Sequence, residues 1–231
     1  MTYDLHIHSC LSPCAEDDMT PANIAGFAKL NGIELIAVTD HNAADNLPAV
    51  QTACKAYGVK LLPGIEATTA EEIHILTYFA TVEKALQMSG LLYAHLPNIP
   101  CDHKIWGRQL VMDEDDHILE EKQKLLSAAT SLTIYEVAQA CAALGGIAVP
   151  AHVDKETTSL LSVLGFAPDD LPFEAYEVKR PEHALPKLLQ TGRLPAGCAV
   201  LTSSDAHCLA DIAEYPRARA ESSALWRLIN Q

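Results

Sequence analysis

Several strand-like segments of this chain end in histidine or a carboxylate. The first, DLHIHS, carries His6 and His8 two residues apart, and the last, SSDAH, carries Asp205 and His207 with the same spacing. In a strand, residues i and i+2 point to the same side about 6.5–7 Å apart, so each pair could hold one ion. The segments TDHN, GIE, EIHIL and AHVDK lie between them and add four more candidates: His41, Glu66, His74 and His152.

Imidazole and carboxylate groups in one site are better ligands for Zn²⁺, Fe or Mn²⁺ than they are for Ca²⁺ or for Mg²⁺ alone. The set exceeds the three or four protein ligands of a single catalytic metal, which implies two or three divalent ions. One histidine at a strand end is more often structural than a ligand. The joint arrangement over six strand ends is what favours a metal site.

These side chains need elements that bring them to one place. Seven short apolar runs read as buried strands, and amphipathic stretches at 20–32, 47–58 and 133–146 read as helices. Strands that alternate with helices predict a mainly parallel sheet wrapped by helices. Seven strands favour a closed or nearly closed (βα)7 barrel, with an open doubly wound sheet as the alternative. The seven runs are 3–7, 32–39, 59–66, 72–79, 146–151, 173–178 and 198–203.

The segment at about 80–132, between the fourth and fifth strands, interrupts this alternation. TVEKALQMSGLLYAHLP predicts a helix, and QLVMDEDDHILEEK predicts a hairpin around its acidic turn. We interpret the segment as an insertion over one end of the barrel. Since there is no clear linker or internal repeat, residues 1–231 are expected to form a single domain.

The amino-acid composition of the chain indicates which kinds of molecule it is expected to bind. The formal charge of −14 argues against non-specific binding to duplex nucleic acid, which needs a basic surface. The amino-terminal residues lack a signal-peptide pattern, and no run is long enough to span a membrane. Seven cysteines without CxxC spacing predict free thiols in a reducing cytosol, so we expect a cytoplasmic protein with no membrane partner. The oligomeric state stays open.

In this order and at these intervals, DLHIHS, TDHN, GIE, HIL, AHVDK and SDAH resemble the motifs of the PHP (polymerase and histidinol phosphatase) family, here in a stand-alone form. The resemblance covers nearly the whole chain. It implies a distorted (βα)7 TIM-like barrel, usually a trinuclear metal site at the C-terminal ends of the strands, and phosphoester hydrolysis. It further implies that one ion binds His6, His8, Glu66 and Asp205, a second binds Glu66, His74 and His152, and a third binds His41, His207 and a residue from the loop after His8.

That loop, SCLSPCAEDDMTP, departs from the short Ser-Asp-Gly element common in the family. Its ligand could be Cys14, Glu16, Asp17 or Asp18. Asp17 is the preferred candidate, because a carboxylate keeps the ligand chemistry of the family. Asp18 could instead stabilise the N-terminus of the following helix. Alternatively, Cys10 and Cys14 only pack.

The chemistry predicted for such a site is hydrolysis of a small phosphate ester, with metal-activated water as nucleophile. Glu66, Asp205 and His207 are the residues expected to act in catalysis, and Lys155, Lys179 and Arg180 could bind the phosphate. No GxSxG elbow is found. Histidinol phosphate, nucleotides and short oligonucleotides are candidate substrates.

Two other functions remain open. An amidohydrolase-type barrel also begins with HxH, but usually has eight strands, a bridging lysine and a single terminal aspartate. A non-catalytic metal-binding module would more often lack ligands, and this chain carries a nearly complete set.

Overall fold

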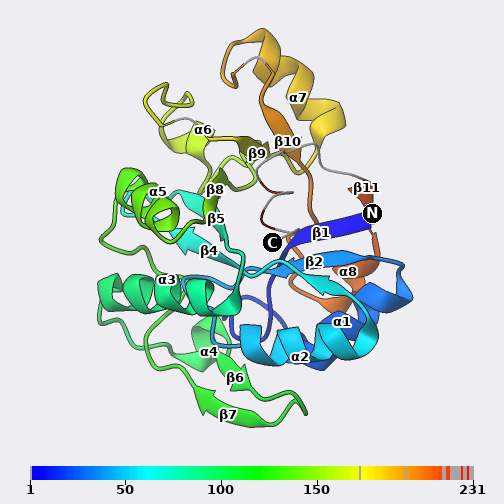
Figure 1. The fold of residues 1–231 in the computed structure, drawn as a ribbon. Helices are drawn as coiled ribbons and strands as arrows, with labels where there is room; N and C mark the ends of the chain where they lie inside the picture. The colour runs from blue at the N-terminus through cyan, green and yellow to red at the C-terminus, as the bar shows by residue number, and fades with distance from the viewer. Residues whose placement is uncertain are drawn as a thin grey trace.

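Strands and helices alternate along most of the chain (Figure 1). The computed structural model describes residues 2–171, 173–195, 197–214, 217–218, 225 and 228. The strands are β1 (Thr2–Ile7), β2 (Leu35–Val38), β3 (Lys60–Leu61), β4 (Gly64–Thr68), β5 (His74–Tyr78), β6 (Leu110–Met112), β7 (Ile118–Glu121), β8 (Ile147–Pro150), β9 (Ala175–Glu177), β10 (Ala199–Leu201) and β11 (Arg217–Ala218). The helices are α1 (Pro21–Leu30), α2 (Leu47–Tyr57), α3 (Val82–His95), α4 (His103–Trp106), α5 (Ile134–Ala143), α6 (Leu160–Val163), α7 (Pro181–Gln190) and α8 (Leu209–Glu214).

Local signals account for the helix ends. Thr20 caps α1 by accepting a hydrogen bond from the Asn23 amide, and Pro21 occupies the first turn. Gly58 ends α2 in the left-handed conformation, with φ of 70°. At α5, Thr133 and Glu136 form a reciprocal capping box. The three helices predicted from sequence are therefore confirmed.

Each of the seven predicted strand segments contains a strand, although the third is divided. The run at 59–66 becomes β3 and β4, separated by Leu62 and Pro63. Proline has no N–H to donate, so it interrupts the ladder at that point. β3 pairs with β2, and β4 begins a different sheet.

The strands pair as separate sheets, in the orders β11-β1-β2-β3, β4-β5-β8, β10-β9 and β6-β7. Two isolated parallel bridges, Ile7–Ala206 and His41–Glu66, connect β1 to the residues after β10 and β4 to the residues after β2. The α/β class is thus confirmed, whereas a closed barrel is not detected in the described residues. One apolar cluster nevertheless draws side chains from β1, β2, β5, β8, β9 and β10.

The prediction of a mainly parallel sheet is wrong for β5. This strand runs antiparallel to both β4 and β8. Only residues 69–73 connect β4 to β5, and a parallel connection needs a crossover of about a dozen residues or more. The start of β5 therefore lies at the same end as the finish of β4, with Thr68 opposite His74.

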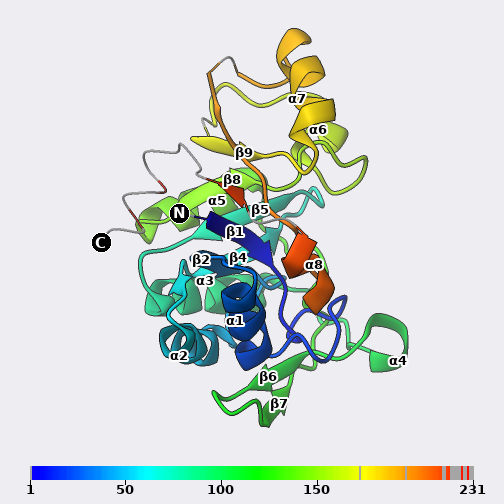
Figure 2. The same ribbon diagram turned by 90° about the vertical axis from the view of Figure 1, so that its right-hand side faces the viewer.

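The segment at 80–132 contains the predicted helix, α3, and the predicted hairpin, β6–β7. The hairpin lies at the opposite end of the molecule from α6 and α7 (Figures 1 and 2). It packs against the loop after β1: the Leu110 amide donates to the Cys10 carbonyl at 2.8 Å, and the Asp116 carboxylate accepts from Thr20 at 2.6 Å. In the ranges described above, no helix combines the length and apolar character needed to cross a bilayer.

Candidate metal centre

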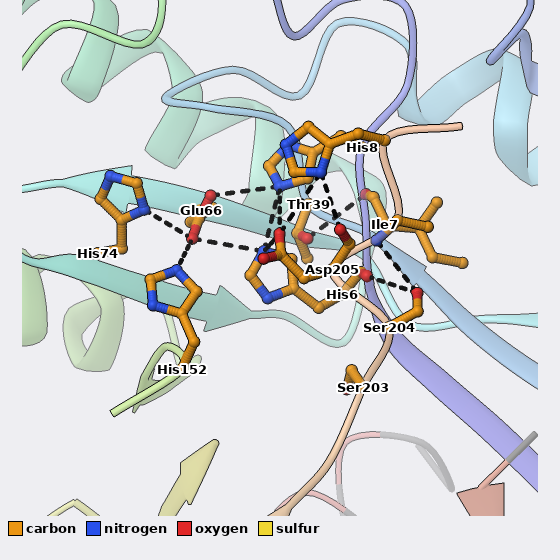
Figure 3. Close-up of polar contacts among 12 residues, drawn as sticks. His6, Ile7, His8, Thr39, Glu66, His74, His152, Ser203, Ser204 and Asp205 are labelled. Carbon is orange, nitrogen blue, oxygen red and sulfur yellow. Dashed lines mark hydrogen bonds and ion pairs between the residues drawn. The ribbon is translucent and has the colours of Figure 1, made fainter. Parts of the chain in front are cut away.

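Six histidines and two carboxylates from distant parts of the chain meet at one buried position. Figure 3 shows His6, His8, Glu66, His74, His152 and Asp205 turned toward one another. The antiparallel course of β5 explains His74, since the first residue of that strand lies beside the last residue of β4. The residues brought together are His6, His8, His41, Glu66, His74, His152, Asp205 and His207.

Glu66 is the centre of this group. Its Oε1 lies 2.9 Å from His74 Nδ1, 3.1 Å from His152 Nε2 and 3.4 Å from His6 Nε2. Its Oε2 lies 3.1 Å from His41 Nδ1 and 3.3 Å from His8 Nε2. One carboxylate therefore contacts five imidazoles, as expected of a group that bridges two cations.

Asp205 closes the other side of the cluster. Its Oδ1 lies 3.4 Å from His6 Nε2, 3.5 Å from His8 Nε2 and 3.8 Å from His207 Nδ1. Its Oδ2 accepts a hydrogen bond from Lys155 at 2.6 Å and lies 3.4 Å from Lys179 Nζ. One oxygen thus faces the histidines and the other faces two lysines.

A second layer of polar groups orients the histidines. The carboxylate of Glu177, at the end of β9, accepts from His6 Nδ1 at 3.0 Å and from the His152 amide at 2.8 Å. The Ser12 hydroxyl donates to Asp40 at 2.6 Å, so His8 Nδ1, 3.0 Å away, donates to Ser12. Both contacts leave an Nε2 directed into the cluster, the tautomer that a metal ligand requires.

The protein environment favours the ligand forms of several side chains. Burial alone would raise the pKa of Glu66, but the charges of His74 and His6 outweigh it and hold that pKa well below its usual range. The Asp205 pKa is lowered in the same way by His6 and His8. Burial lowers the pKa of His207 to about 4 and the pKa of His152 below its usual value, so these imidazoles are neutral near neutral pH.

Nearby carboxylates raise the pKa of two histidines, His6 and His8. Burial would lower the pKa of His6, but Glu177, Glu66 and Asp205 raise it well above the usual value. The pKa of His8 is also raised, because hydrogen bonds to Asp205 and Glu66 outweigh its burial. A cation that binds these two imidazoles therefore displaces protons.

Two site residues have an uncommon backbone conformation. His152 has φ of 28° and Asp205 has φ of 55°. Positive φ is unfavourable for residues other than glycine, and such positions concentrate at functional sites. Both residues follow a strand end, where the turn aims their side chains into the cluster.

The donor set fits divalent metal ions. Two nitrogens that share a tetrahedral ion at about 2.0–2.1 Å lie roughly 3.3 Å apart. The separations of His6 Nε2 from His8 Nε2, at 3.1 Å, and from Asp205 Oδ1, at 3.4 Å, match that spacing. Three groups of potential ligands have atoms within 4.8 Å of one another: His6, His8 and Asp205; His41, Glu66 and His74; and His8, Cys14, His41 and His207.

The structure does not bring the preferred loop candidate into these groups. Asp17 is exposed, and its carboxylate lies 3.5 Å from the Arg108 guanidinium. Cys14, one of the alternatives, is the loop residue that joins the histidines. Cys10 is buried against Leu110 and Met112, which is the packing role considered for it.

Of the three predicted phosphate-binding residues, two contact the cluster and the third lies farther from it. Lys155 and Lys179 contact Asp205, as described above. Arg180 lies farther along and lines a groove of about 720 Å³ together with Lys155, Lys187 and Arg193. Two acidic residues, Asp154 and Glu156, line the same groove, so its basic residues exceed its acidic ones in a chain whose net charge is −14.

Sequence reasoning missed the orienting residues Glu177, Ser12 and Asp40. Glu177 has a visible signal, because it is a charged residue at the end of the apolar segment FEAYEV. Asp40 has the same signal, since it directly follows the apolar run at 32–39, whereas Ser12 has none, because its contact with Asp40 joins segments 28 residues apart. All seven cysteines are free thiols, as predicted.

Comparison with known proteins adds two sequence relatives. An uncharacterized protein of Methanocaldococcus jannaschii is 31% identical over 134 residues, which cover 50% of this chain and 78% of that protein. A 5′-3′ exoribonuclease of Haemophilus influenzae is 31% identical over 77 residues, or 32% of this chain and 27% of the relative.

Solved structures share the fold at low identity. An amidohydrolase of Chromobacterium violaceum is 19% identical with a TM-score of 0.63, covering 100% of this chain and 96% of that one. A candidate metal-dependent phosphoesterase of Bifidobacterium adolescentis is 18% identical with a TM-score of 0.59, covering 98% and 94%. The lesion-specific endonuclease Q of Pyrococcus furiosus is 20% identical with a TM-score of 0.62. The alignment covers 90% of this chain but only 48% of the endonuclease chain, so this chain spans about half the length of that protein.

The family follows from the sequence match. The PHP domain matches residues 4–149, which is more than half of the chain and includes most of β1 and all of β2, β4 and β5, with their histidines and Glu66. The fold and the buried cluster agree with this match. This chain therefore belongs to the PHP domain family.

Proposed function

We propose that this protein is a metal-dependent phosphoesterase that hydrolyses a small phosphate ester. The observation that carries the proposal is the buried convergence of six imidazoles on Glu66 and Asp205. Membership of the PHP family supports it, as do a relative named as an exoribonuclease and a structural neighbour named as a candidate phosphoesterase.

The cluster would hold two or three divalent cations, either Zn, Mn or Fe. When bound, they would supply Lewis acidity toward phosphoryl oxygens and an activated water as nucleophile. Glu66 would bridge two of the ions, and Asp205 with His6 and His8 would hold one of them. Because the nucleophile would be water, no serine or cysteine of the chain is required as one.

The lysines beside Asp205 define where the substrate phosphate would bind. The Lys155 and Lys179 ammonium groups lie 2.6 and 3.4 Å from Asp205 Oδ2, at the edge of the buried cluster. Each is partly exposed, so an incoming anion can reach them. The groove that continues toward Arg180 would receive the leaving group, which suits a nucleotide, a short oligonucleotide or a histidinol-phosphate-like molecule.

A phosphate-release screen tests the proposal. Purified protein loaded with Zn²⁺, Mn²⁺ or Fe²⁺ is assayed with histidinol phosphate, nucleoside monophosphates, 3′,5′-bisphosphates and short oligonucleotides, and its metal content is measured in parallel. We expect metal-dependent release from at least one class. Turnover of a cyclic amide with no release from any phosphate ester would instead support an amidohydrolase.

The substrate-binding role of Lys155 is tested separately. Lys155→Ala should lower kcat/KM by about 10- to 100-fold, the rate equivalent of one charge-assisted hydrogen bond. Lys60→Ala, at an exposed position on β3, is the matched control and should leave kcat/KM unchanged. An unaltered kcat/KM in Lys155→Ala would exclude the lysine from substrate binding.

A further inference from the structure

The loop after β1 is fixed on both sides of Cys14. The Ala15 amide donates to the Ser12 carbonyl at 3.0 Å, and the Glu16 amide donates to the His207 carbonyl at 2.9 Å. The Pro13 carbonyl is packed so closely on Gly107 that a Cβ at Gly107 would overlap it. Cys14 is therefore an exposed side chain on a constrained backbone, adjacent to His207.

The Cys14 sulfur is positioned for a ligand. It belongs to a group in which one ligand atom each from Cys14, His8, His41 and His207 lies within 4.8 Å of the others. His8 Nε2 also faces His6 and Asp205, so it can serve a different ion. That leaves Cys14, His41 and His207 as three protein ligands, the number typical of a catalytic site with an open position.

The acidic residues of the same loop are directed elsewhere. Asp17 pairs with Arg108, and Glu16 and Asp18 are exposed. None of these three carboxylates belongs to a group of potential ligands in the described part of the chain. Cys14 is thus the loop residue that both lies near the histidines and carries a donor atom able to bind a metal ion.

The geometry points to Cys14 as a thiolate ligand of the cation held by His41 and His207. This inference rests on the metal centre of the proposed function and specifies one of its ligands. On binding, the sulfur–hydrogen bond of Cys14 breaks, a sulfur–metal bond forms, and the proton leaves to solvent. Thiolate is a softer ligand than carboxylate, so this position prefers Zn²⁺ or Fe²⁺ over Mn²⁺ or Mg²⁺.

Cobalt substitution tests the assignment directly. The metal-free protein is loaded with Co²⁺, and the near-ultraviolet absorption that arises from thiolate-to-cobalt charge transfer is recorded. We expect one thiolate band in the wild-type protein and its loss in Cys14→Ser. Cys101→Ser, at a partly exposed cysteine outside the cluster, and Asp17→Asn should each keep the band.

Metal content provides a second measurement. Cys14→Ser should retain one cation fewer per chain after dialysis, or bind that cation more than about tenfold more weakly, since even outer-shell changes cost roughly 10–100-fold. Cys14→Asp should restore a cation and shift the preference from Zn²⁺ toward Mn²⁺. Circular dichroism of each variant checks that the fold is kept.

The outcomes separate this inference from the proposed function. A cobalt-loaded wild-type protein without the band, or a band that persists in Cys14→Ser, would overturn the thiolate assignment even if phosphate esters are hydrolysed. If the band behaves as expected but no phosphate ester is hydrolysed, the ligand assignment stands and the proposed reaction fails.

Discussion

At the scale of the residue, the chemistry of the site depends on how each side chain is oriented. Glu66 contacts five imidazoles because β4 places it between the ends of β1, β2, β5 and β8. His6 and His8 face the cluster through Nε2, since Glu177 and Ser12 occupy their other nitrogens. Substitutions can therefore distinguish the residues expected to bind metal from the residues that orient them.

The first prediction concerns the ligands. His8→Ala and Asp205→Asn should each lose bound metal and reduce phosphoesterase activity by more than about 100-fold, because the effect should exceed that of outer-shell changes. Metal analysis and the phosphate-release assay check this, and circular dichroism should show an unchanged fold. His117→Ala and Asp115→Asn, both exposed in the β6–β7 turn, are the controls. Wild-type turnover in either ligand variant would contradict the site assignment.

The second prediction concerns an orienting group. Glu177→Gln keeps the size of the side chain but removes the charge that holds His6 and the His152 amide. The affinity for metal should fall by roughly 10–100-fold, the usual cost of losing an outer-shell carboxylate. A competition titration with a chelator measures it. Glu174→Gln, exposed just before β9, should bind metal as the wild type does, and equal affinities for the two variants would remove Glu177 from this role.

At the scale of the element, short connections decide which strand ends meet. The link at 69–73 forces β5 to run antiparallel, which moves His74 to the end of the sheet where Glu66 lies. The loop after β1 is similarly held by the β6–β7 hairpin, through the Leu110–Cys10 hydrogen bond. The segment at 80–132 therefore supports the site loop in addition to forming a helix and a hairpin.

The third prediction tests that support. Gly107 has φ of 95° and contacts Pro13, so Gly107→Ala strains the backbone and displaces the loop that carries Cys14. We expect a loss of about 1–3 kcal/mol in the free energy of unfolding, seen as a melting temperature lower by several degrees.

The control for this change is another glycine. Gly90→Ala in α3 has no heavy atom within 4 Å of the added Cβ, and should be neutral or stabilise by up to about 1 kcal/mol. If Gly107→Ala melts at the wild-type temperature, the loop is not constrained by this contact.

At the scale of the whole molecule, charge is distributed unevenly. The chain carries a net charge of −14, yet its buried site places six imidazoles around two carboxylates, and its neighbouring groove is lined by four basic residues and two acidic ones. Cations at the site would bind the folded chain far better than an unfolded one, because the ligands are distant in sequence. Metal binding and folding would therefore be coupled.

The fourth prediction follows from that coupling. At a free metal concentration about 100 times its Kd, binding adds about 2.7 kcal/mol to stability, which should raise the melting temperature by roughly 5–10 °C. Differential scanning calorimetry of metal-free and Zn²⁺-loaded protein measures the shift. The His8→Ala variant should show a smaller shift, and an identical shift would place the stabilising metal elsewhere.

The sequence by itself determined the seven strand segments, the helices α1, α2, α3 and α5, and the convergent histidines, because hydrophobic period, helix caps and i, i+2 spacing are local properties. It also determined the family, through DLHIHS, TDHN, GIE, HIL, AHVDK and SDAH. It did not determine the direction of β5. The link between β4 and β5 is only five residues long, whereas the pattern of the chain predicted strands that alternate with helices.

Only the tertiary structure decided which residue of the SCLSPCAEDDMTP loop faces the site. The sequence left four candidates, and the preferred one, Asp17, lies beside Arg108 instead. Cys14 reaches the histidines because hydrogen bonds to Ser12 and His207 and the contact with Gly107 fix the loop. The contacts with His207 and Gly107 join residues far apart in the chain, so local pattern cannot encode them.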